Sequence, residues 1–93
     1  MKISNSETKT GLNRRLRKVE GQVRGVQKMI DDERDCRDIL QQLSAIRSAV
    51  QGVSLAFIHE VASDCANNLE NTDPSERPTL VGDLIDLFSK ASD

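Results

Sequence analysis

A stretch of thirty-five residues without proline, from Asp35 to Leu69, runs through the middle of the chain. Its apolar residues recur at spacings of three and four, which is the period of an α-helix. They form one seam that only Gly52 weakens: Ile39, Leu43, Ile46, Val50, Val53 and Phe57. The pattern predicts a single helix of more than thirty residues. A globular helix of that length is unusual unless a partner covers it.

Two shorter segments flank this one and show the same helical spacing. The first carries an apolar stripe of Leu12, Leu16, Val19, Val23, Val26 and Ile30. The second places four apolar residues on one face: Leu80, Leu84, Leu87 and Phe88. No segment shows the alternation of a strand, so the sequence predicts an all-α fold. We expect three helices, over residues 6–30, 35–69 and 78–90, in a single domain that spans residues 1–93.

The chain is too short and too poor in aromatic residues to build a large core. It has 93 residues, no tryptophan or tyrosine, and two phenylalanines, so it buries only a modest core alone. We therefore expect an oligomer of identical chains. No apolar run approaches the ~20 residues of a membrane span. The N-terminus lacks the apolar stretch of a signal peptide, which predicts a cytoplasmic protein.

Charge is distributed unevenly along the chain. Residues 1–30 contain eight Lys or Arg and two Glu, a net charge of +6, whereas residues 31–93 contain five basic and thirteen acidic residues, a net charge of −8. A basic first third on an acidic remainder favours a face that binds a polyanion such as DNA. The alternative is a solvated helix surface without a partner.

The segment LNRRLRKVEGQVRG places cationic side chains off the apolar stripe, where guanidinium and ammonium groups can contact phosphates. We predict six DNA-contacting residues: Arg14, Arg15, Arg17, Lys18, Arg24 and, from the long helix, Arg47. No helix-turn-helix, zinc-finger or aromatic stacking pattern is visible. The pattern favours a flat, basic, helical face that recognises DNA through its backbone and shape.

The two cysteines, Cys36 and Cys65, lie twenty-nine residues apart within the predicted long helix. At 1.5 Å per residue they would be about 43 Å apart, too far for a disulfide or a shared ligand in one protomer. Two antiparallel copies that cross near residues 50–51 would bring Cys36 of one copy beside the partner's Cys65, and two-fold symmetry would repeat the pair. The alternative is two unrelated buried cysteines that behave as small apolar residues.

Three features occur in order along the chain: LNRRLRKVEGQVRGVQKMI, then DCRDILQQLSAIRSAV, then a cysteine twenty-nine residues after the first. Together they resemble the CsoR/RcnR family of bacterial repressors over about residues 9–90. The resemblance implies an antiparallel dimer and a tetramer built as a dimer of dimers. It also implies a protein that binds operator DNA and releases it when a site between subunits is occupied. No acid–base motif accompanies the only histidine, His59, so we do not expect an enzyme.

Val61, one helical turn before Cys65, distinguishes the subgroups of this family. The resemblance implies histidine at this position in copper sensors and in nickel or cobalt sensors. Persulfide sensors, the CstR-like members, keep both cysteines and lack the histidine, which is the pattern that this chain matches. His59 lies two residues from Val61 and points to another side of the helix, so it does not replace the missing donor.

The leading prediction is a repressor that senses persulfide or polysulfide and uses no metal cofactor. Cys36 would take sulfane sulfur from the inducer, and the partner's Cys65 would resolve it as a disulfide or a sulfur-bridged link. The alternative is a Cu(I)-responsive repressor that holds the ion with Cys36 and Cys65, because Cu(I) is soft and prefers thiolates. The expected partners are operator DNA, further copies of the chain as a dimer or tetramer, and small sulfane-sulfur molecules as inducers.

Overall fold

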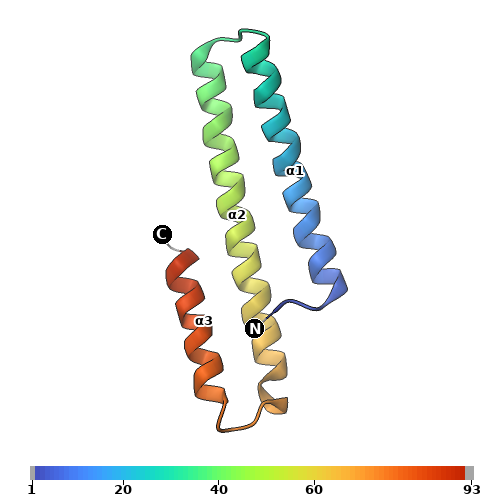
Figure 1. The fold of residues 1–93 in the computed structure, drawn as a ribbon, viewed down its shortest axis with the longest axis vertical. Helices are drawn as coiled ribbons and strands as arrows, with labels where there is room; N and C mark the ends of the chain where they lie inside the picture. The colour runs from blue at the N-terminus through green and yellow to red at the C-terminus, as the bar shows by residue number, and fades with distance from the viewer. Residues whose placement is uncertain (1, 92–93) are drawn as a thin grey trace.

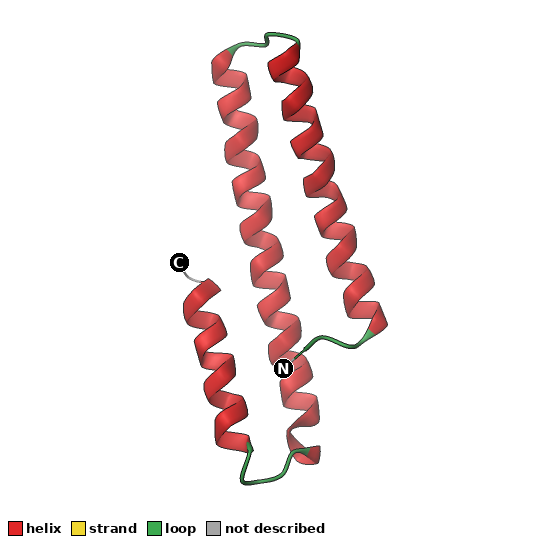
Figure 2. Cartoon of the chain, in the orientation of Figure 1, coloured by secondary structure: helices red, strands yellow, loops and turns green. Residues whose placement is uncertain are grey.

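Three α-helices make up the computed structural model, which describes residues 2–91 (Figures 1 and 2). Helix α1 spans Ser6–Asp31, α2 spans Cys36–Asn68, α3 spans Arg77–Ala91, and one turn of 3-10 helix, Leu69–Asn71, follows α2. No strand occurs in residues 2–91, so the predicted all-α, three-helix fold is confirmed. Each helix begins and ends within one residue of the range expected from the sequence.

The helices lie side by side in a single layer. α1 and α2 form an antiparallel hairpin, and α3 returns along the other side of α2 (Figure 1). The protomer measures 59 × 27 × 13 Å, so its thinnest dimension is about one helix diameter. Among the described apolar residues only Val26, Ile58 and Val61 are buried, while eleven large ones are exposed. A stable domain needs a second layer to bury such faces, and copies of the chain are the natural source of that layer.

Side-chain caps set where the first two helices begin. The Asn5 side-chain oxygen accepts hydrogen bonds from the backbone N–H groups of Glu7 and Thr8, at 2.9 and 3.2 Å. The Asp35 carboxylate accepts one from the N–H of Arg37 at 2.8 Å. Both interactions satisfy N–H groups that have no partner inside the helix. The cap at Asp35 therefore makes the next residue, a cysteine, the first of α2.

The two turns between helices are also held by local hydrogen bonds. In the first, Glu33 adopts a left-handed backbone with φ of 55°, and its N–H donates to the carbonyl oxygen of Ile30 at 3.1 Å. In the second, Ser75 donates to the Asp73 carboxylate from its N–H and its hydroxyl, both at 3.0 Å. These bonds lower the pKa of Asp73.

None of the helices described has the length and apolar character that a membrane span requires.

A short extended segment, residues 2–5, precedes α1 and is called the N-terminal arm below. From the start of α1 it runs back across to α2 (Figure 1). Ile3 is half-buried, whereas Lys2 and Ser4 are exposed. The arm therefore packs on the protein through one apolar side chain.

Candidate intersubunit thiol site and DNA-binding face

Cys36 opens helix α2 at an exposed position. It follows the capping residue Asp35 directly and precedes Arg37, and its side chain is exposed. The turn from α1 into α2 places it at one extreme of the long axis, at the top of Figure 1. A thiol in this position is open to a small molecule or to a second protomer.

Cys65 lies near the opposite end of α2 and is half-buried. It lines a cavity of about 210 Å³ that α2 shares with Leu80 of α3 and with the N-terminal arm. At the rim, the Asn68 side-chain amide donates to the carbonyl oxygen of Asp64 at 2.8 Å and to its carboxylate at 3.3 Å. The Cys65 thiol therefore faces a small cavity and is only partly open to solvent.

The two thiols do not meet within one protomer. α2 is an unbroken helix of 33 residues, so Cys36 and Cys65 are separated by about 43 Å at 1.5 Å per residue. Residues 2–91 contain no cluster of three His, Cys, Asp or Glu side chains that could hold a metal ion. Any site that uses both thiols needs a second copy of the chain.

Val61 and His59 lie in different surroundings on α2. Val61 is only 5% exposed and lines the same cavity as Cys65. His59 is exposed and lines a separate cavity with Thr8 and Arg15 of α1. Its neighbour Glu60 is half-buried and accepts a hydrogen bond from the Thr8 hydroxyl at 3.4 Å, which ties α2 to the first turn of α1. The only imidazole therefore faces α1 and not the Cys65 cavity.

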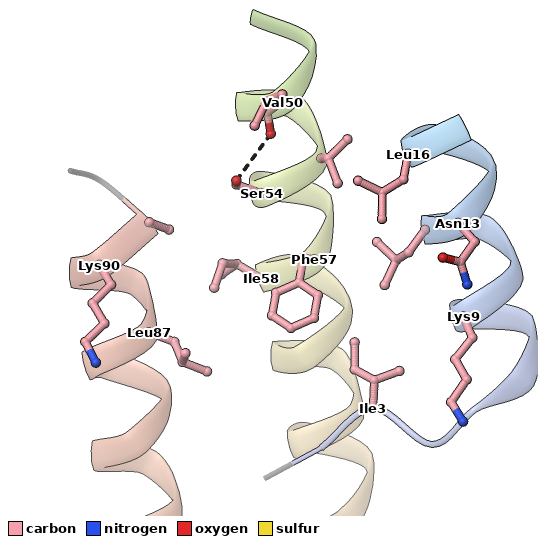
Figure 3. A pocket seen from close by; sticks show the side chains of 13 residues that line it. Ile3, Lys9, Asn13, Leu16, Val50, Ser54, Phe57, Ile58, Leu87 and Lys90 are labelled. Carbon is pink, nitrogen blue, oxygen red and sulfur yellow. Dashed lines mark hydrogen bonds between the residues drawn. The ribbon is translucent and has the colours of Figure 1, made fainter. Parts of the chain in front are cut away.

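An apolar groove of about 670 Å³ runs along α2 between α1 and α3 (Figure 3). Leu16 of α1 and Leu87 of α3 lie on opposite sides of Phe57 in this view. The α2 residues that line the groove begin at Val50, beside the midpoint of Cys36 and Cys65 in the sequence. A second α2 laid antiparallel over this groove would bring each cysteine near the other cysteine of its partner.

The predicted DNA-contacting residues are all exposed. Five lie on α1 and one on α2: Arg14, Arg15, Arg17, Lys18, Arg24 and Arg47. None of the six enters an ion pair with another described residue. Arg47 lies one helical turn before Val50, which lines the apolar groove together with Leu16 of α1. These cations are therefore available to phosphate groups.

Ile3 is the residue near the thiol site that the sequence reasoning missed. It lines both the Cys65 cavity and the apolar groove. The signal was present as a single apolar residue among polar ones in the segment KISNSETK. A lone apolar residue outside any periodic segment does not indicate what it contacts, because the periodicity that assigns a buried face is absent.

Residues 8–90 match the model of a protein family described as the metal-sensitive transcriptional repressors. The chain belongs to this family, the CsoR family of repressors. Over 85 residues it is 35% identical to the copper-sensing transcriptional repressor CsoR of Bacillus subtilis (strain 168), covering 91% of this chain and 82% of that protein. It is also 43% identical to the copper-sensing repressor RicR of Mycobacterium tuberculosis over 60 residues, which are 64% of this chain and 62% of RicR.

Solved structures of similar proteins have the same helical fold. The crystal structure of the copper-sensing repressor CsoR with Cu(I), from Geobacillus thermodenitrificans NG80-2, superposes with a TM-score of 0.80 at 33% identity, covering 100% of this chain and 95% of that one. The nickel-responsive transcriptional regulator InrS gives a TM-score of 0.77 at 22% identity, covering 97% and 99%. The likeness to InrS concerns the fold alone.

These findings make the protein a metal-sensitive transcriptional repressor and not an enzyme. A repressor of this family acts on operator DNA as an oligomer. The expectation that it uses no metal is wrong, because similar repressors are copper-sensing and one was solved with Cu(I). That expectation gave too much weight to the missing donor at Val61, since two thiolates are themselves soft ligands that suit Cu(I). Membership of the persulfide-sensing subgroup stays a prediction.

Proposed function

We propose that this protein is a Cu(I)-responsive repressor whose inducer site consists of Cys36 of one protomer and Cys65 of the partner subunit. One observation carries the proposal: the two thiols lie at opposite ends of a single helix, and an apolar groove lies beside the point midway between them. An antiparallel dimer that buries this groove pairs the thiols twice, once at each end. We further propose that two such dimers form a tetramer, because the single-layer protomer has two broad faces.

The donor set fits Cu(I) in kind. Thiolate sulfur is a soft ligand, and soft ligands select Cu(I) over the harder divalent ions. Cys36 reaches the site from an exposed helix start, while Cys65 reaches it from the edge of its cavity. Val61 supplies no donor atom, so the protein offers two ligands. When bound, Cu(I) would supply a link between the two thiolates that fixes the protomers relative to each other.

The same dimer connects the thiol site to DNA binding. α1 carries the cluster from Arg14 to Arg24 and packs along α2 as a hairpin. A change in how two α2 helices cross therefore changes the spacing and angle of two basic faces. Allosteric coupling is typically about 1–3 kcal/mol, which lowers operator affinity by about 5- to 150-fold. We propose that residues 1–93 act as one DNA-binding domain, in the cytoplasm, where operator DNA is found.

A second candidate inducer, reactive sulfur species, is favoured by the burial of Val61 beside Cys65. A Cys36 thiolate would attack the outer sulfur of a persulfide RSSH, forming a Cys36 persulfide and releasing the thiolate RS⁻. The thiolate of the partner's Cys65 would then attack the Cys36 sulfur, forming the Cys36–Cys65 disulfide and releasing hydrosulfide. The sulfane sulfur is reduced as the two thiols are oxidised, so the step needs no further oxidant.

Operator binding with and without Cu(I) tests the proposal. A DNA fragment selected from a random pool by the reduced protein serves as the operator in an anaerobic anisotropy titration. One equivalent of Cu(I) per protomer should raise Kd by about 10- to 100-fold. Cys36→Ser should bind the fragment equally well and show no response. An unchanged Kd with Cu(I), together with release by polysulfide, would replace the first candidate by the second.

A further inference from the structure

We propose that the N-terminal arm is a gate that controls which molecules reach Cys65, with Ile3 as its anchor. The proposal rests on the function proposed above, because it concerns the access of inducers to the same thiol. It adds a specificity-determining residue that lies outside the pair of cysteines and outside the basic face.

The arm forms one wall of the Cys65 cavity. Lys2 and Ile3 line it from the arm, while Val61 and Leu80 line it from α2 and α3. The cavity volume is about 210 Å³, about seven times the ≈30 Å³ that one water molecule takes up in the liquid. A compact inducer fits in this space beside the thiol, whereas a bulky one fits only if the arm moves away.

A single apolar side chain holds the arm in place. Ile3 is half-buried and also lines the large groove, where it points toward the space between Phe57 and α1 (Figure 3). Ser4, the next residue, is exposed and lines neither cavity. An extended segment with so few apolar contacts opens at a small free-energy cost compared with unfolding of the helices. Within one protomer the contacts of Ile3 therefore mainly govern how readily the arm opens, and a partner α2 laid over the groove would add to these contacts.

The gate acts on one thiol of the pair. Cys36 is exposed, and the cavities lined by the arm do not include it. Cys65 is half-buried, with the arm on one side. In the proposed dimer the partner's Cys36 approaches from another side, so the arm sets the size of molecule that can enter beside the two sulfur atoms. Small inducers are accepted and large thiol-reactive molecules are excluded.

Labelling rates of Cys65 test the gate directly. The full chain carries Cys36→Ser so that Cys65 is the only thiol, and mass spectrometry follows its reaction with iodoacetamide and with a maleimide attached to a large polyethylene glycol. Ile3→Gly should raise the labelling rate with the bulky maleimide by about tenfold. The half-buried Ile side chain stabilises the closed arm by about 1.4 kcal/mol, and its loss raises the population of the open arm about tenfold. The rate with iodoacetamide should not change.

Matched variants separate the gate from a general loosening of the protein. Ser4→Gly adds the same backbone freedom one residue away and should leave both rates unchanged, while Ile3→Leu should restore slow labelling by the bulky reagent. Deletion of residues 2–4 should have the same effect as Ile3→Gly. Equal acceleration by Ser4→Gly, or unchanged labelling after the deletion, would overturn the gate.

The outcome is independent of the test of the proposed function. Labelling measures access to Cys65 without DNA or Cu(I), whereas the anisotropy titration measures operator release. If the bulky reagent labels every variant at the same rate while Cu(I) still releases DNA, the gate is wrong and the repressor mechanism stands. If the arm variants behave as expected but neither inducer releases DNA, the gate stands and the proposed function fails.

Discussion

Cys36 is the first residue of α2, and Cys65 lies three residues before its last, Asn68. One rigid helix therefore holds the two thiols about 43 Å apart, at 1.5 Å per residue. Neither sulfur can reach the other within one chain, so each can pair only with a sulfur of a second protomer. Whether the two thiols meet therefore depends on how two chains are placed relative to each other. The same relative placement sets the spacing of the two basic faces, which a repressor must regulate.

Replacement of the buried valine beside Cys65 should change the metal chemistry of the site. Val61 lines the Cys65 cavity, so Val61→His places an imidazole donor one helical turn from the thiol. We expect Cu(I) affinity, measured by competition with a chelator, to rise. Burial of a polar ring should at the same time lower the free energy of unfolding by about 1–3 kcal/mol. Val61→Ile adds no donor and serves as the control. An equal affinity in the two variants would show that position 61 does not face the bound ion.

Removal of one cation from α1 should weaken DNA binding and its dependence on salt. Arg15 is exposed, and each lost phosphate contact lowers the slope of log K against log salt by about 0.9. Arg15→Ala should show this smaller slope in titrations at several salt concentrations. Arg15→Lys keeps the charge and should keep the slope, although it loses the planar fork of the guanidinium. If both variants keep the wild-type slope, Arg15 does not contact phosphate.

The turn that presents Cys36 should be sensitive to the residue at position 33. Glu33 has a φ of 55°, a left-handed conformation that is unfavourable for residues with a Cβ atom by about 1–2 kcal/mol. Glu33→Gly should therefore raise the midpoint of thermal unfolding, and Glu33→Val, which adds a β-branched side chain, should lower it. Circular dichroism at 222 nm measures both. The reverse order would mean that this turn does not adopt the left-handed conformation in solution.

The helices were predictable because each has a periodic apolar face, from Leu12 to Ile30 in α1 and from Ile39 to Phe57 in α2. Their limits were predictable because acidic and polar residues such as Asp35 interrupt these patterns and cap the next helix. The role of Ile3 could not be predicted from the sequence. It is an isolated apolar residue outside any periodic segment, and its contacts arise only when the chain has folded.

The identity of the inducer could not be predicted from the sequence either. Val61 indicates which donor is missing, but the absence of a donor does not decide whether two thiolates bind a soft ion or react with sulfur. The same two cysteines support both chemistries. The expectation of a site without metal failed at this point, because it treated a missing third ligand as the loss of the metal itself.

Mixed dimers of two cysteine variants test the central claim most directly. Cys36→Ser and Cys65→Ser, each with a different affinity tag, are co-expressed and purified through both tags. The mixed dimer then keeps one intact pair and has one site with neither thiol. We predict one tight Cu(I) site per mixed dimer, two per wild-type dimer, and none in either variant alone. Tight binding by a single variant, or no recovery in the mixed dimer, would contradict a site shared between protomers.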